Sequence, residues 1–194
     1  MILKIKSGSL SGRLLRSVLE NFVIKDVEKN GMCKGKIVLA DSIGEKGHFT
    51  IRWLYTDEME GQLLEALASV FEYNKVQRYV MAFAGSIGEP PEGEVDTLLV
   101  ECVRGATSLV IRQFRTLYDN KNISGFEEVL VDELNYDSEL NLLRMTNMPI
   151  QDARRFLEAR KKEKEQLIIL GPNFLADDEA EYIAEMNRLM KNKH

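Results

Sequence analysis

The sequence predicts an α+β fold: a mainly antiparallel or mixed sheet of about five to six strands, two helices packed on it, and a helical carboxyl-terminal region. Three observations indicate this class. Several apolar runs have the length of strands and are joined by short connections, which favour antiparallel neighbours. Two longer segments repeat apolar residues every three to four positions, as amphipathic helices do. The last part of the chain is rich in charge and in helix-starting patterns.

The expected strands comprise one short strand near the start of the chain, one hairpin and three consecutive runs. In the second strand of the hairpin, Phe49, Ile51 and Trp53 alternate with polar residues, which is the period of a half-buried strand. Gly105 suits a turn with positive φ between the last two runs. The expected strands are residues 2–6, 36–41, 48–55, 78–84, 97–103 and 108–116.

Each of the two expected helices has one apolar face. The first helix ends at Asn30 and Gly31, and the second is capped by the Thr56 hydroxyl and has acidic residues in its first turn. These faces and the apolar strands should be buried against one another. We expect the core to include Leu14, Val18, Phe22, Leu63, Leu67, Val70, Val80, Leu99, Val110 and Ile183.

The sequence pattern changes from strand-like to helical after Tyr118. Ser124 and Glu127 match a capping box that would open a short helix over residues 124–134, and Pro149 fits the first turn of a charged helix. We therefore divide the chain into an α+β sheet domain, residues 1–118, and a helical region packed on it or extending from it, residues 119–194.

The chain is acidic overall, with 26 basic and 31 acidic side chains and a net charge of −5. Residues 1–56 hold 10 basic and 5 acidic side chains, whereas residues 57–105 hold 3 and 10. An acidic chain is not expected to bind nucleic acid in bulk. No apolar run has the length of a signal peptide or of a membrane span, so we expect a cytoplasmic protein without membrane contact.

Cysteine and histidine usage argues against several kinds of site. Cys33 and Cys102 cannot form a disulfide framework or a tetrahedral zinc site, and we expect two free thiols. Neither cysteine lies in a nucleophile motif, and Cys102 falls in an apolar strand, where it is typically a small buried hydrophobe. His48 and the terminal His194 are the only histidines. The sequence therefore indicates no catalytic residue, no metal site and no cofactor.

The most site-like segment lies between the first strand and the first helix. Small residues, free backbone N–H groups at a helix start and nearby cations are what phosphate binding requires. The segment lacks both the Walker pattern and Gly-x-Gly-x-x-Gly, and the alternative is that Ser9 or Ser11 simply caps the helix. The candidate ligand-binding residues are Ser7, Gly8, Ser9, Ser11, Gly12 and Arg13.

Two acidic groups are candidates for cation or partner binding. The Pro-containing loop 85–94 carries Glu89 and Glu92, and recognition by a partner is favoured there over chemistry. In the expected helix 124–134, Glu128 and Asp132 would lie one turn apart, as carboxylates that share a metal or a proton would. The alternative for both groups is an ordinary solvated surface.

The charged helix after Pro149 is a candidate interaction surface. Its apolar stripe fades after Leu157, so its second half should project into solvent or meet another chain. A solvated helix with internal ion pairs is the alternative. The apolar run 167–170 must then be covered by the sheet or by a second copy. The candidate interaction residues are Glu89, Glu92, Arg154, Arg155, Arg160, Lys161, Lys164, Ile168 and Ile169.

These features together favour a non-catalytic protein that binds another protein or itself. An inhibitor, immunity or regulatory protein from a bacterium or a mobile element fits the split charge and the projecting helix. Two alternatives stay open. One is a binder of a nucleotide or another phosphate-bearing small molecule at residues 7–13, and the other is a metal-dependent hydrolase that uses the acidic groups.

Overall fold

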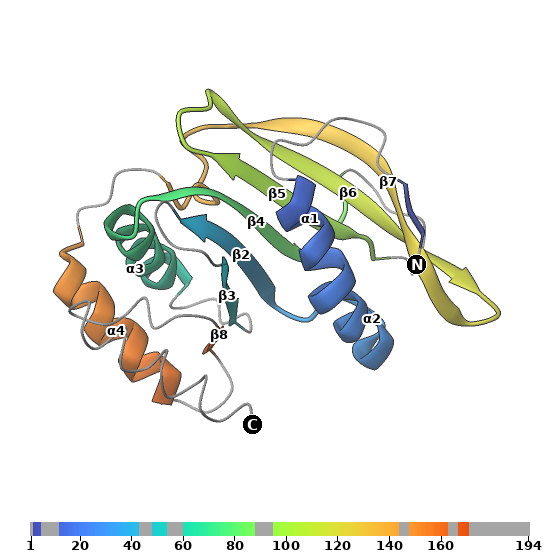
Figure 1. Cartoon of the computed structure of the whole chain (residues 1–194), viewed down its shortest axis with the longest axis horizontal. Coiled ribbons are helices and arrows are strands. Elements are labelled where there is room, and N and C mark those ends of the chain that lie inside the picture. The colour runs from blue at the N-terminus through green and yellow to red at the C-terminus, as the bar shows by residue number, and fades with distance from the viewer. Residues whose placement is uncertain are drawn as a thin grey trace.

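The computed structural model describes residues 2–4, 12–42, 48–53, 60–87, 95–143, 148–162 and 167–170. In these residues a single eight-stranded sheet has the order β1-β7-β6-β5-β4-β2-β3-β8 (Figure 1). Among the described strands only β1 and β7 pair in parallel. The predicted α+β class and mainly antiparallel sheet are confirmed. The strands are β1 (Ile2–Lys4), β2 (Lys36–Ser42), β3 (His48–Trp53), β4 (Val76–Ala84), β5 (Thr97–Val103), β6 (Ser108–Asp119), β7 (Asn122–Asn135) and β8 (Leu167–Leu170).

Helices cover both faces of the sheet (Figure 1). On one face, α1 (Gly12–Val18), a π-helical turn η1 (Leu19–Val23) and α2 (Ile24–Asn30) follow one another without a break. On the other face, α3 (Glu60–Tyr73) packs beside α4 (Ile150–Lys162). The chain leaves α2 at Gly31, whose φ of 77° is left-handed, and this is why a glycine stands at the predicted break.

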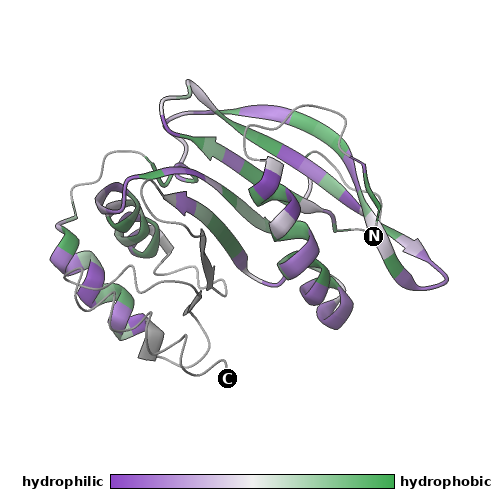
Figure 2. Cartoon of the chain, in the orientation of Figure 1, coloured by the Kyte–Doolittle hydropathy of each residue, from purple (hydrophilic) through white to green (hydrophobic). Residues whose placement is uncertain are grey.

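Alternating residues of the central strands belong to two separate cores, because successive side chains of a strand point to opposite faces. On β4, Tyr79 and Met81 belong to the core beneath α3 and α4, whereas Val80 and Ala82 belong to the core beneath α1 and α2. In Figure 2 the middle of β2 and of β4 is hydrophobic, as expected of strands with an apolar core on each face. The sheet is therefore sandwiched between two apolar helix layers.

The predicted core is largely confirmed. Leu14, Val18, Leu67, Val70, Val80 and Leu99 are buried. Three of the predicted core residues, Phe22, Leu63 and Val110, are only half-buried. At β6 the fully buried neighbour is Leu109, which points to the α3 and α4 core. Ile183 lies outside the described residues.

The predicted helix over residues 124–134 is wrong, because this segment is strand β7. It pairs with β6 from Asp119↔Asn122 to Ser108↔Asn135, so its backbone groups are bonded across strands. The connection is a tight turn in which Asn120 and Lys121 have φ of 49° and 72°, as a two-residue hairpin of type I′ requires. The sheet therefore continues past the domain boundary predicted at residue 118.

The apolar run 167–170 forms β8 and pairs antiparallel with β3 at one edge of the sheet. β7 and β8 were not among the predicted strands, and they bring the total above the predicted five to six. The predicted charged helix after Pro149 is confirmed as α4. The predicted amphipathic helix that carries Ile183 lies outside the described residues.

Candidate functional site

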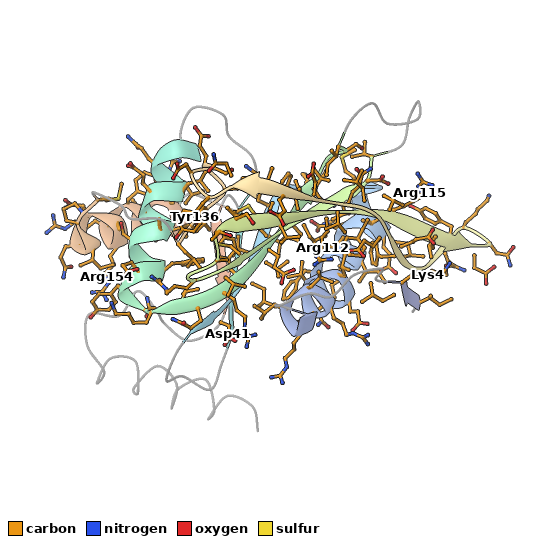
Figure 3. All side chains as sticks on the ribbon, turned by 90° about the horizontal axis from the view of Figure 1, so that it is seen from above. Lys4, Asp41, Arg112, Arg115, Tyr136 and Arg154 are labelled. Atoms are coloured by element: carbon orange, nitrogen blue, oxygen red, sulfur yellow. The ribbon has the colours of Figure 1, made fainter. Side chains whose placement is uncertain are left out.

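Three charged side chains from adjacent strands meet inside the molecule. Arg112 of β6 donates from Nε to Glu101 of β5 at 3.2 Å and from Nη1 to Glu128 of β7 at 2.6 Å. All three side chains are at most 3% exposed. Figure 3 shows Arg112 on the central part of the sheet, away from Arg115 and Lys4. We call these three residues the buried ion cluster.

The buried ion cluster is suited to holding strands together. One guanidinium bridges two carboxylates, so each carboxylate has a charge-assisted hydrogen bond. A substrate cannot approach groups that are this well buried. Each partner lies on a different strand, so the cluster fixes how β5, β6 and β7 are placed relative to one another.

The predicted carboxylate pair Glu128 and Asp132 is not brought together. Glu128 pairs with Phe114, which faces the α1 and α2 core, whereas Asp132 pairs with Ile111, which faces the α3 and α4 core. The register shifts between Gln113 and Phe114, where a β-bulge adds a residue to β7 and reverses the alternation. The two carboxylates therefore lie on opposite faces of the sheet.

The second half of β7 is an edge of the sheet. β1 pairs only with residues 125–127 of β7, and no other described strand pairs with the outer side of residues 128–135. In this stretch Leu130 and Val131 are 39% and 40% exposed. We call residues 130–133 the β7 edge. Unpaired backbone groups beside exposed apolar side chains make such an edge a template for another strand.

The β7 edge is also acidic. Asp132 and Glu133 are exposed, and the chain contains no Lys or Arg from residue 128 to residue 143. The described donors to these carboxylates are neutral: the Ser108 hydroxyl reaches Glu133 at 3.0 Å, and the Glu133 backbone N–H reaches Asp132 at 2.8 Å. The local field at this edge therefore favours a cation.

A neutral polar group lies on the opposite face of the sheet. The Tyr79 hydroxyl donates to the Leu140 carbonyl and accepts from the Leu142 N–H at 2.9 Å. The Cys102 thiol donates to the Asn141 side-chain oxygen at 3.4 Å. Burial raises the pKa of Cys102 to about 11 and the pKa of Tyr79 well above its ordinary value. Cys102 is therefore a protonated, buried thiol, as predicted, and not a nucleophile.

The sequence-predicted phosphate segment is only partly described. Ser7, Gly8, Ser9 and Ser11 lie outside the described residues. Gly12 opens α1, and Arg13 follows it with an exposed side chain.

The loop that carries Glu89 and Glu92 also lies outside the described residues, but its ends are tied together. The Gln113 side chain donates to Asp96 at 2.6 Å and accepts from the Ile87 N–H at 2.9 Å.

The predicted cations of α4 have different surroundings. Arg154 is buried, and its guanidinium lies 4.6 Å from the ring centre of Tyr73, so it joins α4 to α3 (Figure 3). Arg155 is exposed and pairs with Asp152 at 3.7 Å. Arg160 lies 5.5 Å from the ring centre of Phe156. Lys161 stands in the last turn of α4, Lys164 is outside the described residues, and Ile168 and Ile169 pair with β3 through their backbones.

In the described ranges, no group of three or more His, Cys, Asp or Glu side chains could hold a metal ion. Within the same part of the chain, no helix is long and apolar enough to cross a membrane. The two cysteines are both buried and free, which confirms the prediction that they are not joined.

Sequence reasoning missed the β7 edge and two members of the buried ion cluster. The charges Glu101 and Arg112 interrupt two apolar runs that the sequence already placed as neighbouring strands. Opposite charges at such positions are a signal for a buried pair, since a lone buried charge is costly. The β7 edge had no such signal, because the apolar residues of this segment have spacings that also suit a helix.

Comparison with known proteins found no matching family model, no matching curated protein and no matching solved structure.

Proposed function

We propose that this chain is a non-catalytic regulatory protein, of the inhibitor or immunity type, that acts in the cytoplasm of a bacterium by binding another protein. The observation that carries the proposal is the β7 edge. Among the described strands none pairs with its outer side, and it has two neighbouring apolar side chains that are about two-fifths exposed. Proteins usually shield such edges or place charges on them. Asp132 and Glu133 charge one half of this edge, but Leu130 and Val131 leave adjacent apolar surface exposed in the other half, which favours an interaction surface.

Strand addition is the binding mode that fits this geometry. A partner strand beside β7 would bond to the backbone groups on the side that no described strand occupies. Its alternate side chains would meet Leu130 on one face and Val131 on the other. The buried ion cluster supports this mode, because it fixes β7 against β6 and β5 immediately before the edge begins. A rigid edge loses less conformational entropy when a partner binds.

The test replaces the two apolar side chains of the β7 edge by lysine and measures whether a partner protein is still retained. The double variant Leu130→Lys with Val131→Lys should fold, since both side chains are already partly exposed, and it should no longer retain a protein that the wild type captures from its own cells. Tyr118→Lys is the matched control, because Tyr118 is 58% exposed on β6 at the hairpin end, away from the edge. Equal capture by all three proteins, or capture by none, would contradict the proposal.

The two alternatives from the sequence stay predictions. A thermal-shift screen with nucleotides and divalent cations separates them from partner binding, because a ligand that binds the native state raises its stability with concentration. A selective shift with nucleotides would favour the phosphate-binding prediction at residues 7–13, and one with a divalent cation would favour the hydrolase prediction.

A further inference from the structure

We infer that the partner segment is an extended strand in which two adjacent apolar residues lie next to two adjacent basic residues. This inference rests on the proposed function and specifies the chemistry of the partner. It follows from how the two faces of the β7 edge are composed, from the charges around it, and from the strand that β7 already holds.

Both faces of the β7 edge repeat the same order of side chains. Leu130 pairs with Gln113 and Asp132 with Ile111, which places both on the face covered by α3 and α4. Val131 and Glu133 pair with Arg112 and Val110 and lie on the other face. Each face thus offers an apolar residue and then, two positions further, a carboxylate. A strand laid alongside would match them with two apolar residues followed by two cations, or the reverse order if it ran antiparallel.

The carboxylates at this edge are available for such cations. Glu128 is bonded to Arg112 inside the fold, but Asp132 and Glu133 are exposed, and their described donors are one hydroxyl and one backbone N–H. Opposite charges directly across two strands are stabilising, and like charges are destabilising. The edge therefore discriminates between partner strands by charge.

The first half of β7 already holds a short strand with two apolar residues followed by one lysine. β1 lies along it in parallel, and Lys4 pairs with Glu127 across the two strands at 3.5 Å. The close approach depends on Gly125, because a Cβ there would overlap the carbonyl oxygen of Ile2. The chain itself thus shows that the outer side of β7 accepts a short strand with a lysine opposite a carboxylate.

A second copy of β7 fits this edge poorly. Residues 128–135 contain no Lys or Arg, so in no register of a β7–β7 pair does Asp132 or Glu133 meet a cation. A basic strand from a different protein satisfies both carboxylates, and for this reason we assign the edge to such a partner.

The experiment uses the full chain and four synthetic peptides, each with Thr residues on both sides of its central run. Two peptides carry Ile-Val-Lys-Lys or Lys-Lys-Val-Ile, and the other two have Glu in place of each Lys. We expect one of the lysine peptides to bind about tenfold more tightly than its glutamate counterpart, because two favourable cross-strand pairs replace two repulsive ones. Hydrogen exchange should slow at residues 130–133 when that peptide is added.

A charge-reversed variant separates this inference from the proposed function. Asp132→Lys with Glu133→Lys should invert the preference and bind the glutamate peptide more tightly, whereas Asp137→Lys with Glu139→Lys, in the turn beyond β7, should keep the wild-type preference. Equal affinity for lysine and glutamate peptides would overturn the inferred charge. If the peptides bind equally but the Leu130 and Val131 variant still loses its cellular partner, the proposed function stands and only the inferred charge of the partner strand fails. If that variant retains the partner, the proposed function and the inferred partner strand both fail.

Discussion

The two faces of the central sheet bury polar groups in different ways. Beneath α3 and α4, Tyr79 and Cys102 are neutral and bond to the turn that carries Asn141. On the face of α1 and α2, Arg112 holds two carboxylates that are equally well buried. Neutral groups cost little once each has a partner, but buried ions depend on every member being present. This difference predicts that the α1 and α2 face is the one more sensitive to substitution of its buried polar groups.

The largest effect is expected for Arg112→Met. It leaves Glu101 and Glu128 buried without their cation, and the free energy of unfolding should fall by about 3–5 kcal/mol. Urea denaturation measures this loss. Replacing all three residues together, with Leu at both glutamates, should be within about 1 kcal/mol of the wild type or more stable. A single variant that loses less than about 0.5 kcal/mol would mean that the cluster is not buried as described.

Large-to-small substitutions compare the two apolar cores directly. Leu67→Ala on α3 and Leu19→Ala in η1 each remove a side chain that is fully buried. We expect each to cost about 2–5 kcal/mol, since both the transfer and the cavity contributions are lost. Equal losses in the free energy of unfolding, measured by urea denaturation, would show that the two helix layers are packed equally well on the sheet. A cost near zero at either position would contradict the packing of that layer.

The neutral face should lose stability at high pH because of Cys102. The pKa of its thiol is about 11 in the folded chain against an ordinary 9.0, so the unfolded chain releases the proton first. The stabilisation is complete below pH 9 and is lost as the pH rises to about 11, by about 2–3 kcal/mol. The raised pKa of Tyr79 acts in the same direction. The measurement is the difference between the wild type and Cys102→Ala in urea denaturation at pH 8 and pH 11, and a constant difference would contradict the burial of the thiol.

The smallest change in the free energy of unfolding is expected when an exposed ion pair is broken. This pair serves as a comparison for the buried ion cluster. Arg104 donates to Glu72 at 2.7 Å, and this bond lowers the pKa of Glu72. Because the pair is solvated, Glu72→Gln should cost less than about 1 kcal/mol at pH 7. The contribution is present above the ordinary pKa of Glu72 and is lost as the pH falls through the lowered value. A cost that is unchanged at acidic pH would show that the loss is not electrostatic.

Local sequence patterns predicted most of the fold, because the apolar residues of each such element repeat with the period of a helix or of a strand. The apolar stripe of α3 and the alternation in β3 each repeat over several positions. The short link between β5 and β6 leaves little choice but antiparallel pairing of these two strands. The buried Cys102 followed from its place in an apolar strand. These features depend on neighbours in sequence, so one sequence is enough to find them.

β7 departs from its period for a physical reason. A β-bulge near Val129 interrupts the alternation, and Glu128 occupies an inward position that a strand pattern assigns to an apolar residue. Phe126, Val129, Leu130 and Leu134 then have spacings that also suit a helix, and Ser124 with Glu127 completes a helix-start pattern. The pairing with β6 overrides this local preference, since it bonds the whole length of the strand.

The sequence by itself determined the α+β class, the two amphipathic helices, the central antiparallel strands and the free thiols, because each depends on local periodicity or on composition. The tertiary structure alone decided that Arg112 meets Glu101 and Glu128, that Asp132 lies on the face opposite Glu128, and that part of β7 is left as an edge. These depend on which strands become neighbours and in which register, and a single bulge is enough to exchange the faces of every residue beyond it.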